Sequence, residues 1–192
     1  MTIRILAFCG SNRRESLNQQ LLKLAVQGAV DAGAEVTVVR LAEFQLPIYD
    51  GDEELEHGLP KGAIELQELI AQHDALLIAT PEYNGGYTAL LKNAIDWISR
   101  PQVNGSLGTT LFAGKVAALV SASPGLLGGL RSQMGMRTVL DKLGVLVIPN
   151  SFALGSAHQA FDDEGQLHDI TAQRHVLAVG AALAQTVAKF VN

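Results

Sequence analysis

The sequence predicts a three-layer α/β sandwich built on a parallel sheet of five strands. Three observations point to this fold class. Five short, strongly apolar runs recur along the chain, and most are apolar at nearly every position, as strands covered on both faces are. Longer segments with apolar residues at helical spacing lie between these runs. The 192 residues are 48% apolar and 17% charged, so we expect residues 1–192 to form a single domain.

The expected strands lie, in chain order, at residues 3–9, 35–41, 75–80, 116–121 and 145–149. All but the second are nearly uninterrupted runs of apolar residues. Such runs are typical of parallel strands buried between two layers of helices.

The expected helices lie at residues 17–32, 61–72, 87–99, 129–143 and 171–190. Gly33 follows the first of them and Gly144 follows the fourth. Glycine just past the last apolar residue is a common helix terminator, so both residues support these boundaries.

The alternation of strands and helices predicts right-handed crossovers and a parallel sheet. Five strands and five helices match a flavodoxin-like arrangement with the strand order 2-1-3-4-5. This order places a topological switch point beside the first strand. Three segments lack clear periodicity and are expected to be irregular, residues 44–60, 101–113 and 151–169. The first of them is acidic, and we expect it to be a solvated loop.

The composition excludes several function classes. Acidic residues number 19 and basic residues 14, so no basic face for nucleic acid is expected. No apolar stretch reaches the roughly 18 residues of a membrane span. One cysteine excludes an internal disulfide, and five scattered histidines offer no metal-ligand spacing. The first residues lack the basic region and cleavage site of a signal peptide, so we expect a cytoplasmic protein.

The first candidate binding motif is residues 10–18 (GSNRRESLN), between the first strand and the first helix. A helix N-terminus offers unpaired N–H groups and positive partial charge. Ser11, Ser16 and Asn18 add short hydrogen-bonding side chains, and Arg13 adds a cation. The motif therefore predicts a cradle for a phosphate monoester. An ordinary serine-capped helix with surface arginines is the alternative.

Two known phosphate motifs do not fit this segment. The dinucleotide fingerprint and the Walker loop both need further glycines that are absent here. A phosphatase loop with Cys9 as nucleophile would need arginine at position 15, where the chain has Glu15. We therefore expect Cys9 to be a small buried hydrophobic residue.

The second motif is residues 80–86 (TPEYNGG), after the third strand. Pro81 stiffens the turn, while Gly85 allows close approach to the backbone. Tyr83 offers an aromatic face and Asn84 an amide, which suit a planar polar ring. The alternative is a plain turn with a partly buried tyrosine.

The third motif is residues 121–129 (SASPGLLGG), after the fourth strand. Its small residues leave backbone N–H groups accessible to an anionic ligand edge. A flexible connector is the alternative. All three motifs follow strands whose carboxyl ends should meet at one crevice. A ligand with one phosphate, a spacer and a flat heteroaromatic ring would match them together, and FMN fits this description.

These residues resemble the NADPH-dependent FMN reductase family, which includes flavodoxin-like quinone and chromate reductases. The likeness covers nearly the whole chain and is carried by residues 10–18, by Pro81-Glu82-Tyr83-Asn84, by residues 91–97 (LKNAIDW) and by residues 128–131 (GGLR). The resemblance implies FMN contacts at Ser11, Arg13, Ser16, Leu17, Asn18, Pro81, Glu82, Tyr83, Asn84, Gly85, Ser121, Ser123, Pro124 and Gly125.

The resemblance also implies a reaction. NADPH or NADH would reduce bound FMN, which would pass electrons to a quinone, a metal oxyanion such as chromate, an azo compound or free flavin. It implies a homodimer or homotetramer as well. No protein acid or base is assigned. Glu82 is the nearest carboxylate, and a structural role through hydrogen bonding stands beside a catalytic one. Backbone N–H groups of residues 123–125 are expected to stabilise negative charge on the reduced ring. A basic residue for the 2′-phosphate of NADPH could be Arg14, Arg100 or Arg131.

One departure from the family pattern concerns the second motif. Many relatives carry serine at the position of Gly86 and proline at that of Thr88. We expect this change to loosen the turn above the ring. Three other functions stay open at this point: an electron carrier like flavodoxin, an FMN-holding sensor without turnover, and a phosphohydrolase without flavin.

Overall fold

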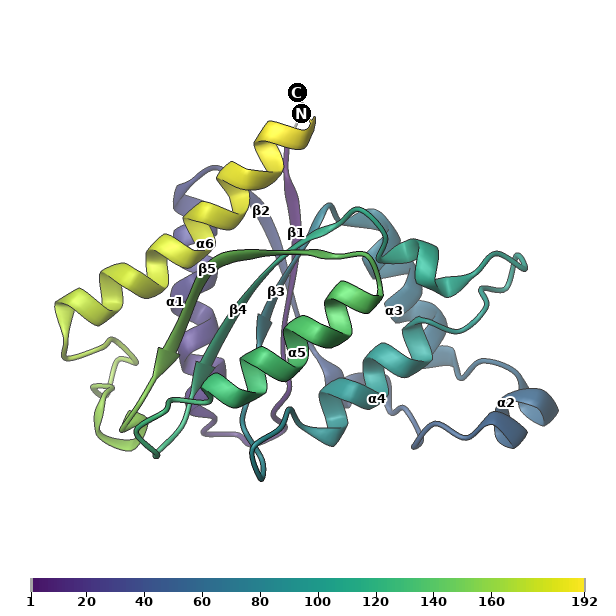
Figure 1. The fold of residues 1–192 in the computed structure, drawn as a ribbon, viewed down its shortest axis with the longest axis horizontal. Coiled ribbons are helices and arrows are strands. Elements are labelled where there is room, and N and C mark those ends of the chain that lie inside the picture. The colour runs from purple at the N-terminus through teal and green to yellow at the C-terminus, as the bar shows by residue number, and fades with distance from the viewer. Residues whose placement is uncertain (1, 192) are drawn as a thin grey trace.

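A computed structural model describes residues 2–191 and contains one parallel five-stranded sheet, in the order β2-β1-β3-β4-β5 (Figure 1). This is the predicted order. The strands are β1 (Arg4–Cys9), β2 (Glu35–Arg40), β3 (Ala75–Ala79), β4 (Val116–Ala122) and β5 (Leu146–Leu154).

Helices cover both faces of the sheet, as expected for a flavodoxin-like fold (Figure 1). One face is covered by α1 (Leu17–Asp31) and α6 (Ile170–Val191). The other is covered by α3 (Lys61–Gln72), α4 (Ala89–Ile98) and α5 (Leu130–Lys142). Among residues 2–191, no helix is both long and apolar enough to cross a membrane.

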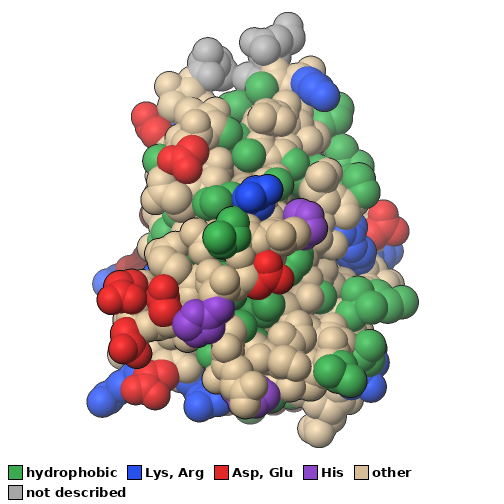
Figure 2. All heavy atoms as spheres, turned by 90° about the vertical axis from the view of Figure 1, so that its left-hand side faces the viewer, with side chains coloured by type: hydrophobic (Ala, Val, Ile, Leu, Met, Phe, Trp, Pro, Cys, Tyr) green, Lys and Arg blue, Asp and Glu red, His purple; other side chains and the backbone are tan. Residues whose placement is uncertain are grey.

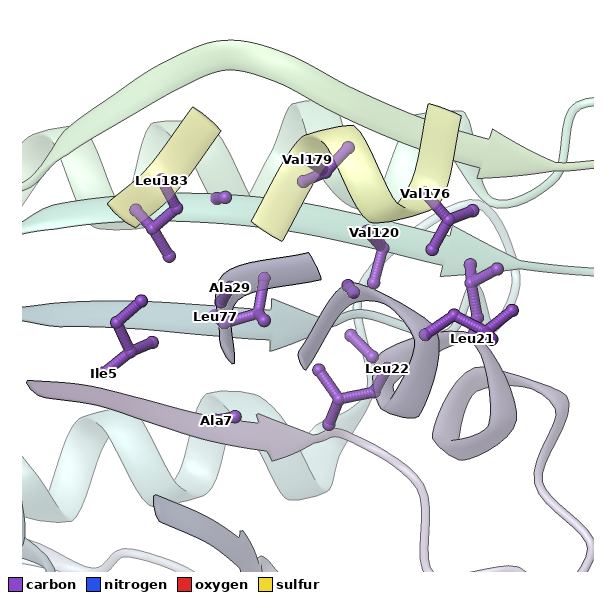
Figure 3. Close-up of a cluster of buried hydrophobic side chains, with 14 of the residues drawn as sticks. Ile5, Ala7, Leu21, Leu22, Ala29, Leu77, Val120, Val176, Val179 and Leu183 are labelled. Carbon is purple, nitrogen blue, oxygen red and sulfur yellow. The ribbon is translucent and has the colours of Figure 1, made fainter. Parts of the chain in front are cut away.

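The core on the α1 and α6 side is shown in Figure 3. Side chains that alternate along the strands, such as Ile5 and Ala7 in β1, point to this face. They pack against Leu21 of α1 and Leu183 of α6, all of them almost fully buried. This layer fixes the start of α1 against the carboxyl ends of β1 and β4.

Two glycines let α1 and α6 approach closely. A Cβ atom on Gly28 of α1 would lie 1.9 Å from the carbonyl oxygen of Leu177. A Cβ atom on Gly180 of α6 would lie 1.8 Å from the carbonyl oxygen of Ala25. Neither position has room for a side chain, so the two backbones are in direct contact.

The acidic segment is not the simple loop that was predicted. It contains a short helix, α2 (Gly51–His57), which Asp50 caps by accepting a hydrogen bond from the Asp52 N–H at 2.8 Å. Gly58 ends it with a positive φ of 74°. No residue of α2 is buried, so the helix carries no apolar stripe that sequence periodicity could reveal.

The last strand is longer than predicted, and part of the segment expected to be irregular belongs to it. The expected strand ended at Pro149, where the apolar run stops. Proline cannot donate a hydrogen bond to a neighbouring strand. The register between β4 and β5 shifts between Ala117 and Leu119, and Pro149 lies in that irregularity. Pairing then resumes with Ser151 and continues to Leu154.

Figure 2 shows the charged side chains on one side of the molecule. Acidic side chains gather toward one side of this view, while Lys and Arg are scattered.

Candidate functional site

Three loops meet at the edge formed by the carboxyl ends of the strands, at the bottom of Figure 1. They follow β1, β3 and β4, which are neighbours in the sheet. The Thr88 hydroxyl donates a 2.7 Å hydrogen bond to the Gly10 carbonyl and so joins the first loop to the second. A Cβ atom on Gly10 would lie 2.7 Å from that hydroxyl, so only glycine fits there.

The first loop ends in a capped helix. The Ser16 side chain accepts a hydrogen bond from the Gln19 N–H at 3.3 Å and so caps α1. The Gln19 side chain donates to the Ser11 carbonyl at 2.9 Å and closes the loop. Arg13 is exposed and makes no ion pair within residues 2–191. The loop therefore offers a free guanidinium beside the positive end of α1.

Asn18 and Leu17 do not present side chains to this loop. The Asn18 amide donates to the Ala122 carbonyl at 2.8 Å and accepts from the Ala122 N–H at 2.9 Å. Asn18 thus pins α1 to the end of β4. Leu17 is partly buried and packs against the core between the helices and the sheet.

Cys9 is a buried residue at the end of β1, as expected. Burial raises the pKa of its thiol to about 11, although hydrogen bonds from Ser11 and Ser16 act in the opposite direction. The thiol is therefore neutral at physiological pH, and a thiolate nucleophile has no support here. This result argues against a phosphatase loop built on Cys9.

The second loop is a tight hairpin that exposes an aromatic ring. Tyr83 and Gly86 exchange backbone hydrogen bonds of 2.9 and 3.0 Å. The residues between them, Asn84 and Gly85, have φ angles of 52° and 81°. Positive φ at both positions defines a type I′ turn, for which Asn-Gly is the favoured pair. The Tyr83 side chain is 55% exposed at the base of this turn.

The turn is closed by two backbone hydrogen bonds and anchored at Thr88. Gly86 takes part in both hydrogen bonds that close it. Thr88 caps α4 by accepting from the Leu91 N–H at 3.3 Å, in addition to its bond to Gly10. The hydroxyl of Thr88 thus provides anchoring that proline, which has no hydroxyl, could not.

Glu82 joins the second loop to α5. Its carboxylate accepts hydrogen bonds from the Arg131 N–H at 3.1 Å and from the Arg131 Nε at 2.8 Å. The Ser132 N–H lies 3.4 Å from the same carboxylate. A carboxylate at a helix N-terminus is electrostatically favourable. The Glu82 side chain is only 8% exposed, and these contacts favour a structural role.

The third loop is braced from within. Ser121 is fully buried, and its hydroxyl donates to the Gly128 carbonyl at 2.7 Å. The Gln133 side chain donates to the same hydroxyl at 2.7 Å. Gly129 has a φ of 89° and lies against Ser121, where a Cβ atom would meet it at 2.8 Å. Pro124 and Gly125 remain exposed above this framework.

The expected charge stabilisation by residues 123–125 is not supported. The Ser123 N–H donates to the Leu154 carbonyl at 3.0 Å, and the Gly125 N–H donates to the Ser123 hydroxyl at 3.2 Å. Pro124 has no N–H to offer. Both available groups therefore already have partners within the protein.

Sequence reasoning missed several residues that hold the loops together. Ser132 bonds to the Thr80 hydroxyl at 2.6 Å and donates to the Pro81 carbonyl at 2.8 Å. Gln133 links Ser121 to β5. These polar residues lie in the first turn of α5, next to a glycine pair, and that position was the only available signal. No group of three or more potential metal ligands occurs within residues 2–191.

Comparisons with known proteins agree with this geometry. The sequence model of the NADPH-dependent FMN reductase family matches residues 3–159. An NAD(P)H-dependent FMN reductase of Pseudomonas aeruginosa is 37% identical over 168 residues, which cover 87% of this chain and 85% of that protein. An NAD(P)H:quinone oxidoreductase of Solanum tuberosum is 36% identical over 94% of this chain and 91% of its own.

A solved structure extends the similarity to the fold. The flavoenzyme NAD(P)H:(acceptor) oxidoreductase of Paracoccus denitrificans superimposes with a TM-score of 0.81 at 27% identity. The match covers 98% of both chains.

Proposed function

Because the chain belongs to the NADPH-dependent FMN reductase family, we propose that its three-loop edge holds FMN and delivers electrons from NAD(P)H to a quinone. The protein is an NAD(P)H-dependent flavoenzyme. When bound, FMN accepts hydride from a nicotinamide and returns the electrons to an acceptor. The observation that carries the proposal is the joining of three ligand-type loops at one edge of the sheet.

The residues at this edge fit FMN in charge and in shape. A phosphate dianion needs cations and donors, and Arg13, beside the N-terminus of α1, makes no ion pair within the described part of the chain. A flat ring needs an aromatic contact and backbone without side chains. Tyr83 is exposed, and Cβ atoms on Gly85 and Gly125 would meet nothing closer than 3.9 and 3.7 Å.

The proposed site residues divide by role. Ser11 and Arg13 would bind the phosphate, while Ser16 and Asn18 hold the loop that carries them. The ring would lie among the second and third loops, with Glu82 and Ser121 bracing them. The remaining proposed contacts are Leu17, Pro81, Tyr83, Asn84, Gly85, Ser123, Pro124 and Gly125.

No protein side chain is assigned to proton transfer. Glu82 is committed to α5 and Arg131, and Tyr83 would cover the ring. The role of the chain is to bind, orient and partly shield the cofactor. An exposed ring edge would let many acceptors approach, so chromate, azo compounds and free flavin belong in the assay beside quinones.

The test is an anaerobic absorption experiment. The purified protein is mixed with FMN, desalted and scanned, and NADPH is then added. For a flavin reductase we expect retained absorption bands at about 370 and 450 nm. These bands should bleach promptly with NADPH and return when a quinone is added. Retained bands that do not bleach would favour the carrier or sensor. Loss of flavin on desalting, confirmed by a titration without binding, would refute the FMN site.

Two further expectations remain proposals. The family resemblance suggests a homodimer or homotetramer, which light scattering behind a sizing column measures directly. A cytoplasmic location is proposed from the sequence alone and is checked by cell fractionation.

A further inference from the structure

The structure distinguishes the three arginines that could recognise the 2′-phosphate of NADPH. Arg100 donates a 2.8 Å hydrogen bond to Glu54 and lies 5.3 Å from the centre of the Tyr49 ring. Arg131 is ion-paired with Glu82. Each of these two charges is therefore already balanced by a carboxylate. Arg14 is exposed and makes no ion pair within residues 2–191.

Arg14 also borders a cavity of about 440 Å³ between α1 and β2. This volume lies in the range of small-molecule sites. Its lining comes from α1, from β2, and from the end of β1 with the loop that follows.

The charged side chains that line this cavity are all positive. The lining contains three cations, Arg14, Lys23 and Arg40, and no carboxylate. Lys23 also lines a neighbouring cavity that contains Asp31, Asp163 and Glu164. Among the ion pairs within residues 2–191, only that of Arg40 with Glu43 at 4.0 Å involves one of these cations, and both side chains are largely exposed. An exposed pair of this kind is weak, so Arg14 and Arg40 both keep a charge that a phosphate group could meet.

The remaining walls are apolar. Leu22 and Val26 come from α1, and Val38 and Val39 come from β2. The Cys9 thiol between them is neutral. A planar base could bury its faces against such walls while a phosphate group meets the cations.

We propose that this cavity binds the adenosine 2′-phosphate of NADPH, with Arg14, Lys23 and Arg40 as its phosphate ligands. The inference rests on the proposed function, because Arg14 belongs to the loop proposed for the FMN phosphate. Arg40 is the last residue of β2, so it lies at the carboxyl edge of the sheet, where open α/β sheets bind their ligands.

The first experiment is calorimetry on the FMN-loaded enzyme. The probes are adenosine 2′,5′-bisphosphate and adenosine 5′-monophosphate, which differ only in the 2′-phosphate. The bisphosphate should bind about tenfold more tightly or better, as charge-assisted hydrogen bonds predict. Arg14→Ala and Lys23→Ala should each remove most of this difference. Equal affinity of the two probes for the unaltered enzyme would overturn the proposal.

The second experiment is steady-state kinetics with a quinone acceptor. Arg14→Ala and Lys23→Ala should raise KM for NADPH about tenfold and leave KM for NADH unchanged. Arg174→Ala and Lys61→Ala are matched controls on other surfaces and should change neither value. Equal effects on both nucleotides would contradict a 2′-phosphate site. If no nucleotide is oxidised at all, the proposed function fails, while calorimetry still reports on the cavity.

Discussion

Glu82 lies where a catalytic residue could lie, but its hydrogen bonds hold the second loop to α5. It lies beside the exposed Tyr83, yet its carboxylate is turned to the first turn of α5 and to Arg131. Asn18 behaves in the same way, since its amide is committed to the backbone of Ala122. A sequence motif identifies such side chains without showing which way they face.

Replacing Glu82 should therefore affect stability more than chemistry. Glu82→Gln removes the charge that faces Arg131 and the start of α5, at a cost of about 1–2 kcal/mol. Urea denaturation measures this loss. Glu65→Gln, in an exposed pair with Lys61 at 3.3 Å, is the control and should cost under about 0.5 kcal/mol. A pH–rate profile that loses one limb in Glu82→Gln would instead mark Glu82 as an acid or base.

Arg13 tests the phosphate assignment directly. Arg13→Ala should weaken FMN binding by about 1–3 kcal/mol, the range for a lost hydrogen bond to a charged group. Quenching of flavin fluorescence on binding gives the dissociation constant. Because Arg13 is exposed and unpaired among residues 2–191, the melting temperature of the flavin-free protein should not change. Unaltered affinity for FMN would remove Arg13 from the site.

Cys9 gives a pH-dependent prediction. Its thiol has a raised pKa of about 11 against an ordinary 9.0, so the fold favours the neutral form. The resulting stabilisation is complete below pH 9 and is lost as pH rises from 9 to about 11. Disulfide-exchange reagents should therefore react at pH 8 about a hundredfold more slowly than with the urea-unfolded chain. Cys9 is the single cysteine, so the absorbance change of the disulfide-exchange reagent reports on this thiol alone.

At the level of elements, α1 and α6 form the tightest contact described here. The sequence periodicity predicted both helices, and it could not predict that their backbones touch at Gly28 and Gly180. Similarly, α2 escaped prediction because it buries nothing, and β5 was cut short because Pro149 lies in an irregularity of the strand. In two of these cases the contact that decides the structure is made with a distant part of the chain, α6 for α1 and β4 for β5. In the case of α2, no buried contact exists that a sequence pattern could reveal.

The contact between α1 and α6 predicts an unusual response to alanine. Gly180→Ala would ordinarily favour a helix by up to about 1 kcal/mol. Here its Cβ would lie 1.8 Å from the Ala25 oxygen, so the helices must separate, and we expect a net loss of about 1–3 kcal/mol. Gly51→Ala, whose nearest neighbour would be the Tyr49 hydroxyl at 3.7 Å, should stay within about 0.5 kcal/mol. Denaturant midpoints compare the two, and equal midpoints would show that the helices can move apart freely.

For the whole molecule, the sequence predicted the strand order and the meeting of three loops. Continuous apolar runs mark parallel strands, and the carboxyl ends of adjacent strands must lie together. The hydrogen bonds between the loops were not predictable from the sequence. Thr88 and Ser132 bond to residues 78 and 52 positions away in the chain. Gln133 bonds to a hydroxyl that is buried. The cavity beside Arg14 was also hidden, since it needs α1 and β2 side by side.

The placement of the chain ends has a practical consequence. The start of β1 and the end of α6 lie at the top of Figure 1, while the three loops lie at the bottom. A tether attached at either end should therefore hold the molecule on an electrode with the loops facing the solution. Catalytic current from NADPH should then be similar for both attachments, and a tether within residues 80–86 should abolish it.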